Sequence, residues 1–144
     1  MDTRLGRGAE LEISTGAYKT LDPQIRPELF AGFHEARLAK PLGLTQFGVN
    51  LVILDPGMRT ALRHWHEAED EFAYVLTGQA VLIDDNGDHL LSEGDFAAFP
   101  AGAPNGHCLE NRSEAPVRLL IVGSRRPGED VVHYPDDPIG PFRR

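Results

Sequence analysis

The chain has 144 residues, of which 41% are hydrophobic, and a formal net charge of -8 from 22 acidic and 14 basic residues. This length suffices for one domain with a hydrophobic core and is short for two. The negative charge disfavours binding to nucleic-acid phosphates or to an anionic membrane, so we expect neither nucleic acid nor a membrane as a partner.

Cysteine content and apolar runs indicate the compartment. The single cysteine, Cys108, excludes an internal disulfide and a four-cysteine zinc site. The first residues contain no apolar core of signal-peptide length, and no run approaches the roughly 20 apolar residues of a membrane-spanning helix. We therefore expect a soluble, cytoplasmic protein.

The N-terminal residues predict a covering arm. Leu11 to Tyr18 is the first strand candidate, and the LDPQIRP segment after it contains two prolines that a helix would not accommodate. We assign residues 1–27 to an N-terminal arm. Residues 28–40 fit either a short amphipathic helix or a bent strand, of which we favour the strand.

The central apolar runs predict strands that are covered on both faces. Leu44 to Asp55 is apolar at almost every position. Phe72, Tyr74 and Leu76 would project from the side of their strand opposite to Glu71. Because a closed sheet of this size has one interior, the outer apolar face requires the N-terminal arm, a second subunit or both, and we expect a homodimer.

Turn signals divide the following segment into short strands. Asn86-Gly87 lies between two strand-like runs, residues 79–84 and 89–91, and is a strong hairpin signal. Residues 96–99 and 117–122 predict two further strands. Short strands at this spacing are typical of an all-β sandwich or barrel.

The last 20 residues differ from the rest in composition. They contain four prolines, which disfavours a helix, and residues 130–134 are a candidate edge strand. We assign residues 28–124 to the barrel and residues 125–144 to a C-terminal extension that packs on the barrel or on a partner.

Candidate metal ligands are concentrated between Gly57 and Gly78. On a β-strand, residues i and i+2 project from the same face, so His64 and His66 would point together to one side. Glu71, at the start of the next apolar run, reaches the same point if the two strands are neighbours. A fourth candidate, His107, follows a loop rich in proline and glycine.

Together these residues resemble the paired signature of the cupin superfamily. That signature has a glycine, His-x-His, a glutamate and a glycine, then G-x5-P-x-G with a later histidine and asparagine. The matched positions are Gly57, His64, His66, Glu71 and Gly78, then Gly94, Pro100, Gly102, His107 and Asn111. Two spacings depart from it: six residues rather than five precede His64, and four rather than two separate Gly102 from His107. The longer second turn alters how His107 enters its strand but removes no ligand.

The resemblance implies a double-stranded β-helix, or jelly roll, that holds a divalent metal on His64, His66, Glu71 and His107. Such a ligand set suits Fe, Mn, Ni, Co or Zn and leaves one or two positions of an octahedral shell for water or substrate. One function that fits is a metal-dependent enzyme on a small oxygen-rich or anionic molecule, with isomerase, lyase or dioxygenase chemistry. The other is a non-catalytic barrel that binds or senses a small molecule.

An enzyme would also need a general acid or base beside the metal that is not itself a ligand. The candidates are Tyr74, Glu69, Asp70, Cys108 and Asn105. We interpret each of them as a surface, turn or packing residue. Cys108 directly follows His107 and should face away from it, which argues against a thiol nucleophile.

Overall fold

The computed structural model describes residues 2–16 and 26–144, and within them the chain is built from antiparallel strands. A six-stranded sheet has the order β1-β2-β3-β10-β5-β8, and two three-stranded sheets have the orders β12-β11-β4 and β7-β6-β9. The strands are β1 (Ser14–Thr15), β2 (Phe33–Arg37), β3 (Phe47–Leu54), β4 (Trp65–His66), β5 (Glu71–Thr77), β6 (Ala80–Asp84), β7 (Gly87–Leu91), β8 (Phe96–Phe99), β9 (Cys108–Glu110), β10 (Val117–Ser124), β11 (Val131–His133) and β12 (Phe142–Arg143). Short 3-10 turns are η1 (Gly8–Glu10), η2 (Pro27–Leu29) and η3 (Lys40–Leu42).

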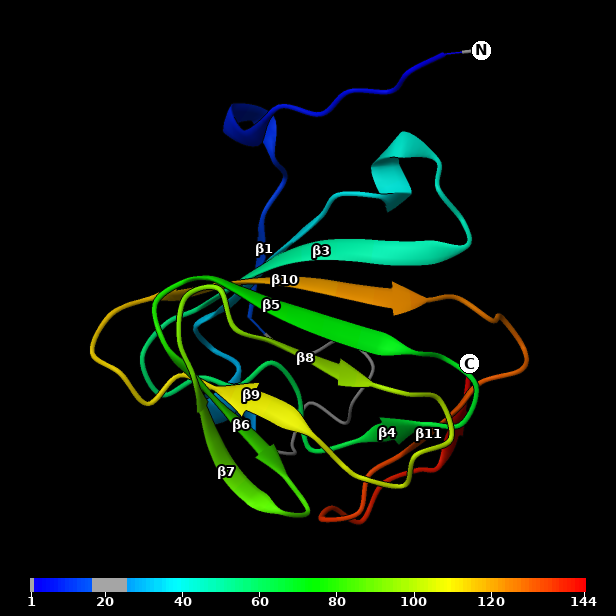
Figure 1. The fold of residues 1–144 in the computed structure, drawn as a ribbon. Coiled ribbons are helices and arrows are strands. Elements are labelled where there is room, and N and C mark those ends of the chain that lie inside the picture. The colour runs from blue at the N-terminus through cyan, green and yellow to red at the C-terminus, as the bar shows by residue number, and fades with distance from the viewer. Residues whose placement is uncertain (1, 17–25) are drawn as a thin grey trace.

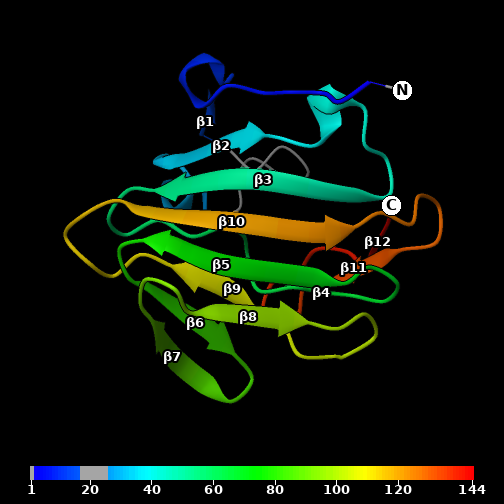
Figure 2. The ribbon, with the colours of Figure 1, turned by 45° about the horizontal axis from the view of Figure 1, so that its top comes forward.

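The sheets form two layers around one core (Figures 1 and 2). In the large sheet Leu119 of β10 is paired with Val52 of β3 and Val75 of β5, so the three side chains lie in one row. All three are buried, because alternation along each strand turns this row toward the smaller sheets. The architecture confirms the all-β jelly roll expected from the sequence.

Several predicted strands have the expected positions. β8 has the predicted bounds, and β6 and β7 form the hairpin around Asn86-Gly87. Residues 28–40 contain the strand β2 between two 3-10 turns, so the strand interpretation was correct. In the described part of the first predicted strand, Ser14–Thr15 form β1 and Leu11 to Ile13 are not strand, while Tyr18 lies outside the described residues.

The C-terminal extension packs on the barrel within this chain. β11 pairs with β4, where Val132 is opposite His66. Arg63 holds the following turn through Asp136, at 2.7 Å, and also donates to the Gly106 carbonyl at 2.8 Å. A side chain at Gly106 would start 2.7 Å from the Pro135 ring, so this close approach requires glycine. The extension therefore lies against the loop that leads into His107, while the boundaries at residues 27 and 124 stay predictions.

The outer face of the six-stranded sheet is apolar over β5 and β8. Phe72 and Tyr74 face away from the core, and their rings stack on Phe96 with centroid distances of 5.9 and 6.3 Å. Phe96 is 64% exposed and Leu76 39%. Among the described residues, no helix is long and apolar enough to cross a membrane.

Candidate metal centre

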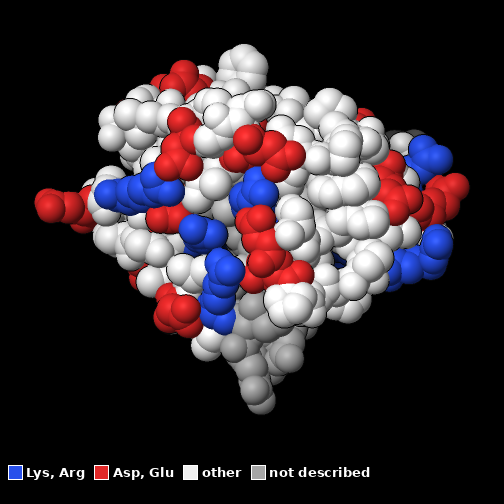
Figure 3. Space-filling view, turned by 90° about the horizontal axis from the view of Figure 1, so that it is seen from below, with Lys and Arg blue, Asp and Glu red and all other residues white. Residues whose placement is uncertain are grey.

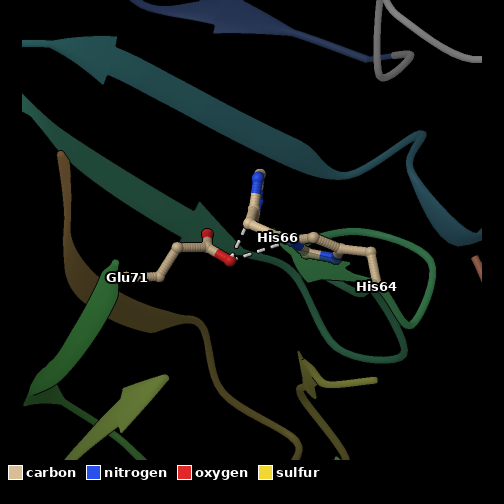
Figure 4. A group of neighbouring side chains, drawn as sticks. All are labelled: His64, His66 and Glu71. Atoms are coloured by element: carbon tan, nitrogen blue, oxygen red, sulfur yellow. Dashed lines mark hydrogen bonds and ion pairs between the residues drawn. The ribbon is translucent and has the colours of Figure 1, made fainter. Parts of the chain in front are cut away.

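Backbone pairing brings the three predicted histidine ligands to one point. His64 and His107 are directly opposite in an isolated antiparallel bridge, with N–H···O distances of 3.2 and 3.0 Å. His66 follows two residues later on β4, and the ring centroids of His64 and His66 are 5.1 Å apart. Glu71 opens β5 and points toward these rings (Figure 4).

All three imidazoles meet the same carboxylate oxygen. Oε1 of Glu71 lies 3.2, 3.1 and 2.9 Å from Nε2 of His64, His66 and His107. Adjacent ligands of an octahedral ion with bonds of about 2.1 Å are about 3.0 Å apart. Donor atoms of His64, His66 and Glu71 also lie within 4.8 Å of one another. The separations of His64, His66 and Glu71 therefore fit ligands that share one ion, while His107, which is not in that group, meets it through its 2.9 Å contact with Glu71.

The opposite nitrogen of each ring faces an oxygen acceptor. These contacts are His64 Nδ1 to Leu62 O at 2.8 Å, His66 Nδ1 to Asp130 Oδ2 at 2.6 Å, and His107 Nδ1 to Asn105 O at 3.2 Å. Carbonyl and carboxylate oxygens only accept, so each Nδ1 carries the hydrogen, and Nε2 of a neutral ring carries a lone pair. A neutral ring of this kind directs its Nε2 lone pair toward Glu71, as a bound cation requires, whereas a protonated ring donates Nε2–H to Oε1 of Glu71 instead.

Without an ion, protons compensate for the charge of Glu71. Burial raises the pKa of Glu71, but the charge of His64 and hydrogen bonds from the three histidines outweigh it and hold the pKa well below its ordinary value. Burial lowers the pKa of His66, but Glu71 and Asp130 outweigh it and raise the pKa above its ordinary value. Protons and a metal ion therefore compete for this site.

Asp130 is a site residue that sequence reasoning missed. Its side chain is fully buried, donates nothing, and accepts from His66 and from the Ala68 backbone N–H at 3.0 Å. Burial raises the pKa of Asp130, but these hydrogen bonds outweigh it and lower the pKa below its ordinary value. We interpreted this segment only as an edge strand, because no local motif marks a partner 64 residues from His66.

His66, Glu69 and Asp130 form a second group of donor atoms within 4.8 Å of one another. The 2.6 Å separation between His66 Nδ1 and Asp130 is that of a charge-assisted hydrogen bond. It is shorter than the about 3.0 Å expected between adjacent ligands of one ion. This group is therefore better explained as support for His66 than as a separate ion site.

A small cavity of about 50 Å³ opens beside the histidines. It is lined by Trp65, His66, Glu69, Glu71, Ala98, Phe99, Pro100, Ala103, Asn105 and His107. Phe99 stacks on the His107 ring at a centroid distance of 3.6 Å and so fixes its plane. Glu71 and residues 98–100 also border an open groove of about 360 Å³. A ligand larger than a few atoms must extend from the cavity toward the outside.

The structure separates the five acid–base candidates. Tyr74 lies on the outer face, and burial raises the pKa of Cys108 to about 11, so neither serves the cavity. Asn105 lines the cavity, but its side chain is bonded to Asp85 N and Asp84. Asp70 accepts from Ala101 N at the surface.

Glu69, interpreted above as a surface, turn or packing residue, lies inside the barrel rather than on its surface. It is 5% exposed and lines the cavity together with three of the proposed ligands. The bend at residues 67–68, between β4 and β5, turns Glu69 inward.

A family model described as a cupin domain matches residues 50–123 of this chain. Among curated protein sequences, none matches the chain. The family match covers more than half of the chain and contains all four proposed ligands.

Solved structures with the same fold include proteins described as isomerases. A sugar phosphate isomerase of the cupin superfamily from Silicibacter pomeroyi is 43% identical, with a TM-score of 0.83, over 90% of this chain and 80% of that chain. A putative sugar phosphate isomerase from Acidithiobacillus ferrooxidans is 31% identical, with a TM-score of 0.67, over 75% and 69%. A predicted oxalate decarboxylase from Thermotoga maritima is 25% identical, with a TM-score of 0.56, over 65% and 81%.

Proposed function

Because this chain belongs to the cupin family, we propose that it is a divalent-metal-dependent enzyme that interconverts the aldose and ketose forms of a small polyhydroxylated molecule. The proposed ligands are Nε2 of His64, His66 and His107 and Oε1 of Glu71. The observation that carries the metal proposal is that every Nδ1 faces an oxygen acceptor, so that a neutral ring at each of the three positions directs its Nε2 lone pair toward Oε1 of Glu71.

The residues of the chain have distinct tasks in this proposal. A bound divalent ion would supply a Lewis acid that polarises a substrate carbonyl. Asp130 and the carbonyls of Leu62 and Asn105 hold the Nδ1 hydrogens and so keep the lone pairs directed inward. Phe99 and Trp65 narrow the cavity and limit the water around the reacting atoms.

Isomerase chemistry is supported by the 43% identity to a protein described as a sugar phosphate isomerase. Support for a phosphate group comes from that similarity, since the described residues lining the cavity and the groove include no lysine or arginine. Several arginines are engaged elsewhere: Arg59 contacts Glu110, and Arg112 contacts Glu110 and Asp88. On the face in Figure 3, basic and acidic side chains lie beside one another.

A binding or sensing function is the second candidate. Its specific support is the cavity of about 50 Å³, far below the roughly 300 Å³ at which small-molecule pockets usually begin. In that case the chain would bind a small anion or a carbonyl compound at the metal without turnover.

The deciding experiment is a substrate screen on tag-free protein that is stripped of metal and reloaded separately with Fe(II), Mn(II), Co(II), Ni(II) or Zn(II). The panel contains aldoses and ketoses of three to six carbons, free and phosphorylated, with oxalate as a probe of decarboxylation. We expect aldose–ketose interconversion, followed by NMR, with at least one ion. A His64→Ala, His66→Ala double variant is the control. Binding without conversion across the panel would favour the second candidate.

We also propose that two copies associate through the outer face of β5 and β8. The exposed Phe96 and Leu76 and the stacked Phe72 and Tyr74 form one apolar surface. A two-fold contact would bury this surface on both copies, since a β-sheet face of this kind is costly to leave in water.

A further inference from the structure

Glu69 is a second carboxylate in the cavity and is separate from the proposed ligand set. It is buried, and it lines the cavity with His66, Glu71 and His107. Its donor atoms group with those of His66 and Asp130, within 4.8 Å of one another, rather than with those of His64 and Glu71. A carboxylate placed beside a metal centre without being a ligand is available for proton transfer.

One oxygen of Glu69 is fixed by the backbone. Oε2 accepts from the Arg126 N–H at 2.8 Å, which sets the direction of the carboxylate. Among residues 2–16 and 26–144, no lysine, arginine or histidine forms an ion pair with Glu69, and Oε1 has no hydrogen-bond partner. By contrast, the nearby Glu67 is half exposed and is paired with His133 at 2.6 Å.

Of the acid–base candidates considered for the cavity, Glu69 remains after the others are excluded. Glu71 directs Oε1 to the three histidines, and both polar atoms of the Asn105 side chain are bonded within the barrel. Burial raises the pKa of the Cys108 thiol to about 11, and this residue does not line the cavity. Among the described residues that line the cavity, Glu69 is the carboxylate that combines burial, a fixed direction and an uncommitted oxygen.

We propose that Glu69 is the general base that moves a proton between two neighbouring carbons of the sugar, an inference that rests on the proposed isomerase function. Its carboxylate takes the proton from the carbon next to the carbonyl. The electrons of that C–H bond form a C=C bond, and the carbonyl π electrons move to the carbonyl oxygen, which gives an enediolate. The substrate and Glu69 exchange only a proton in this step, so the step needs no oxidant or reductant.

The second half of the reaction returns the proton. The hydroxyl proton of the substrate passes through water to the former carbonyl oxygen, and the other oxygen takes the negative charge. A new carbonyl forms at the carbon that bears this negatively charged oxygen. At the same time the C=C electrons take the proton from the Glu69 carboxylic acid, and the new C–H bond forms at the former carbonyl carbon. Glu69 is again a carboxylate, and the aldose has become a ketose.

The competing route is a direct hydride shift between the two carbons, which needs no base at this position. The two routes differ in D2O. A proton carried by Glu69 exchanges with solvent in part of the turnovers, so the product gains deuterium on carbon. A hydride shift leaves carbon-bound hydrogen unlabelled.

The test is conversion in D2O by the metal-loaded protein, with the panel substrate that the native chain converts fastest. We compare native protein, Glu69→Gln, and Glu93→Gln, a control at an exposed turn outside the cavity. Glutamine still accepts from Arg126 N–H, so we expect native metal content and melting temperature. We expect native and Glu93→Gln protein to incorporate deuterium, and Glu69→Gln to lose at least about 100-fold in kcat with little change in KM.

A second variant covers the case in which Glu69→Gln is misfolded or loses metal. Glu69→Ala is assayed with and without formate, with native protein plus formate as a control for inhibition. Recovery of deuterium incorporation by formate supports a base at this position, and its absence overturns the proposal.

The outcomes separate this proposal from the proposed function. Conversion without deuterium, or a Glu69→Gln rate within about threefold of native, overturns the role of Glu69 and leaves the isomerase standing. No conversion of any panel sugar by the native protein overturns both.

Discussion

Nδ1 of His66 lies 2.6 Å from Oδ2 of Asp130, a buried carboxylate that belongs to the C-terminal extension. The contact joins β4 of the barrel to the segment that leads into β11. It orients the ring and assigns the hydrogen to Nδ1, so that Nε2 faces Glu71. The C-terminal extension therefore not only covers the barrel but also contributes Asp130 to the candidate metal centre.

Asp130→Asn should weaken metal binding by about 10- to 100-fold. Asparagine can accept from Ala68 N–H and then presents its amide N–H to His66, which forces the ring to accept at Nδ1 and to carry its hydrogen on Nε2. Asp136→Asn is the matched control, because Asp136 also lies in the extension but contacts Arg63. Calorimetric metal titration checks this, and equal affinities for the two variants would contradict it.

Metal affinity should fall as the pH decreases through the raised pKa of His66, so the decline begins above 6.5, the ordinary value. A proton on Nε2 removes the lone pair that the ion needs. A competition titration with a coloured chelator over a pH series measures this. A constant affinity down to about pH 5.5 would argue against histidine ligation.

The same groups set the pH dependence of stability of the metal-free protein. The raised pKa of His66 stabilises the fold below its ordinary value of 6.5, and this contribution is lost as the pH rises through the folded pKa. The lowered pKa of Glu71 stabilises the fold above 4.5, and this is lost as the pH falls. We expect the pair to contribute most between these two values. Urea unfolding of the chelator-treated protein checks this, with the free energy of unfolding of native protein compared with that of Glu71→Gln across a pH series. A difference between the two that keeps rising through pH 6.5 would contradict the prediction.

Cys108 should be unreactive in the folded protein. The residue is 1% exposed, and burial raises the pKa of its thiol to about 11, so little thiolate is present near neutral pH. Iodoacetamide at about pH 8 should label urea-unfolded protein at least about tenfold faster than native protein. Equal labelling rates would show that β9 opens readily.

Tyr74→Lys should convert a dimer to a monomer. A lysine on the outer face of β5 places a charge within the stack with Phe96. Light scattering should give about twice 15.8 kDa for native protein and 15.8 kDa for the variant. Leu90→Lys is the control, since Leu90 is an exposed apolar residue on β7 of another sheet. A native mass of 15.8 kDa would contradict the dimer.

Local patterns were sufficient for most strands and for the candidate ligands. The apolar alternation of β5 and the Asn86-Gly87 turn are determined by neighbours in the chain, so periodicity identifies them. His64 and His66 share a side because they are two residues apart, and the paired signature adds Glu71 and His107.

The positions of Asp130 and Glu69 at the site depend on long-range contacts and were not predicted from the sequence. Asp130 gains its role through strand pairing between β11 and β4, which no local pattern encodes. Glu69 lies in a run of acidic residues that resembles a solvated loop, and its burial depends on the bend before β5 and on the backbone of Arg126. In both cases the fold, rather than the residue type, decides which carboxylate is buried.

The most direct test of the metal centre is anomalous diffraction at the absorption edge of the ion bound to the tag-free protein. We expect one peak per chain, within about 2.3 Å of Oε1 of Glu71 and of Nε2 of His64, His66 and His107. No peak at this position, or a peak between Glu69, Asp130 and Nδ1 of His66, would contradict the account.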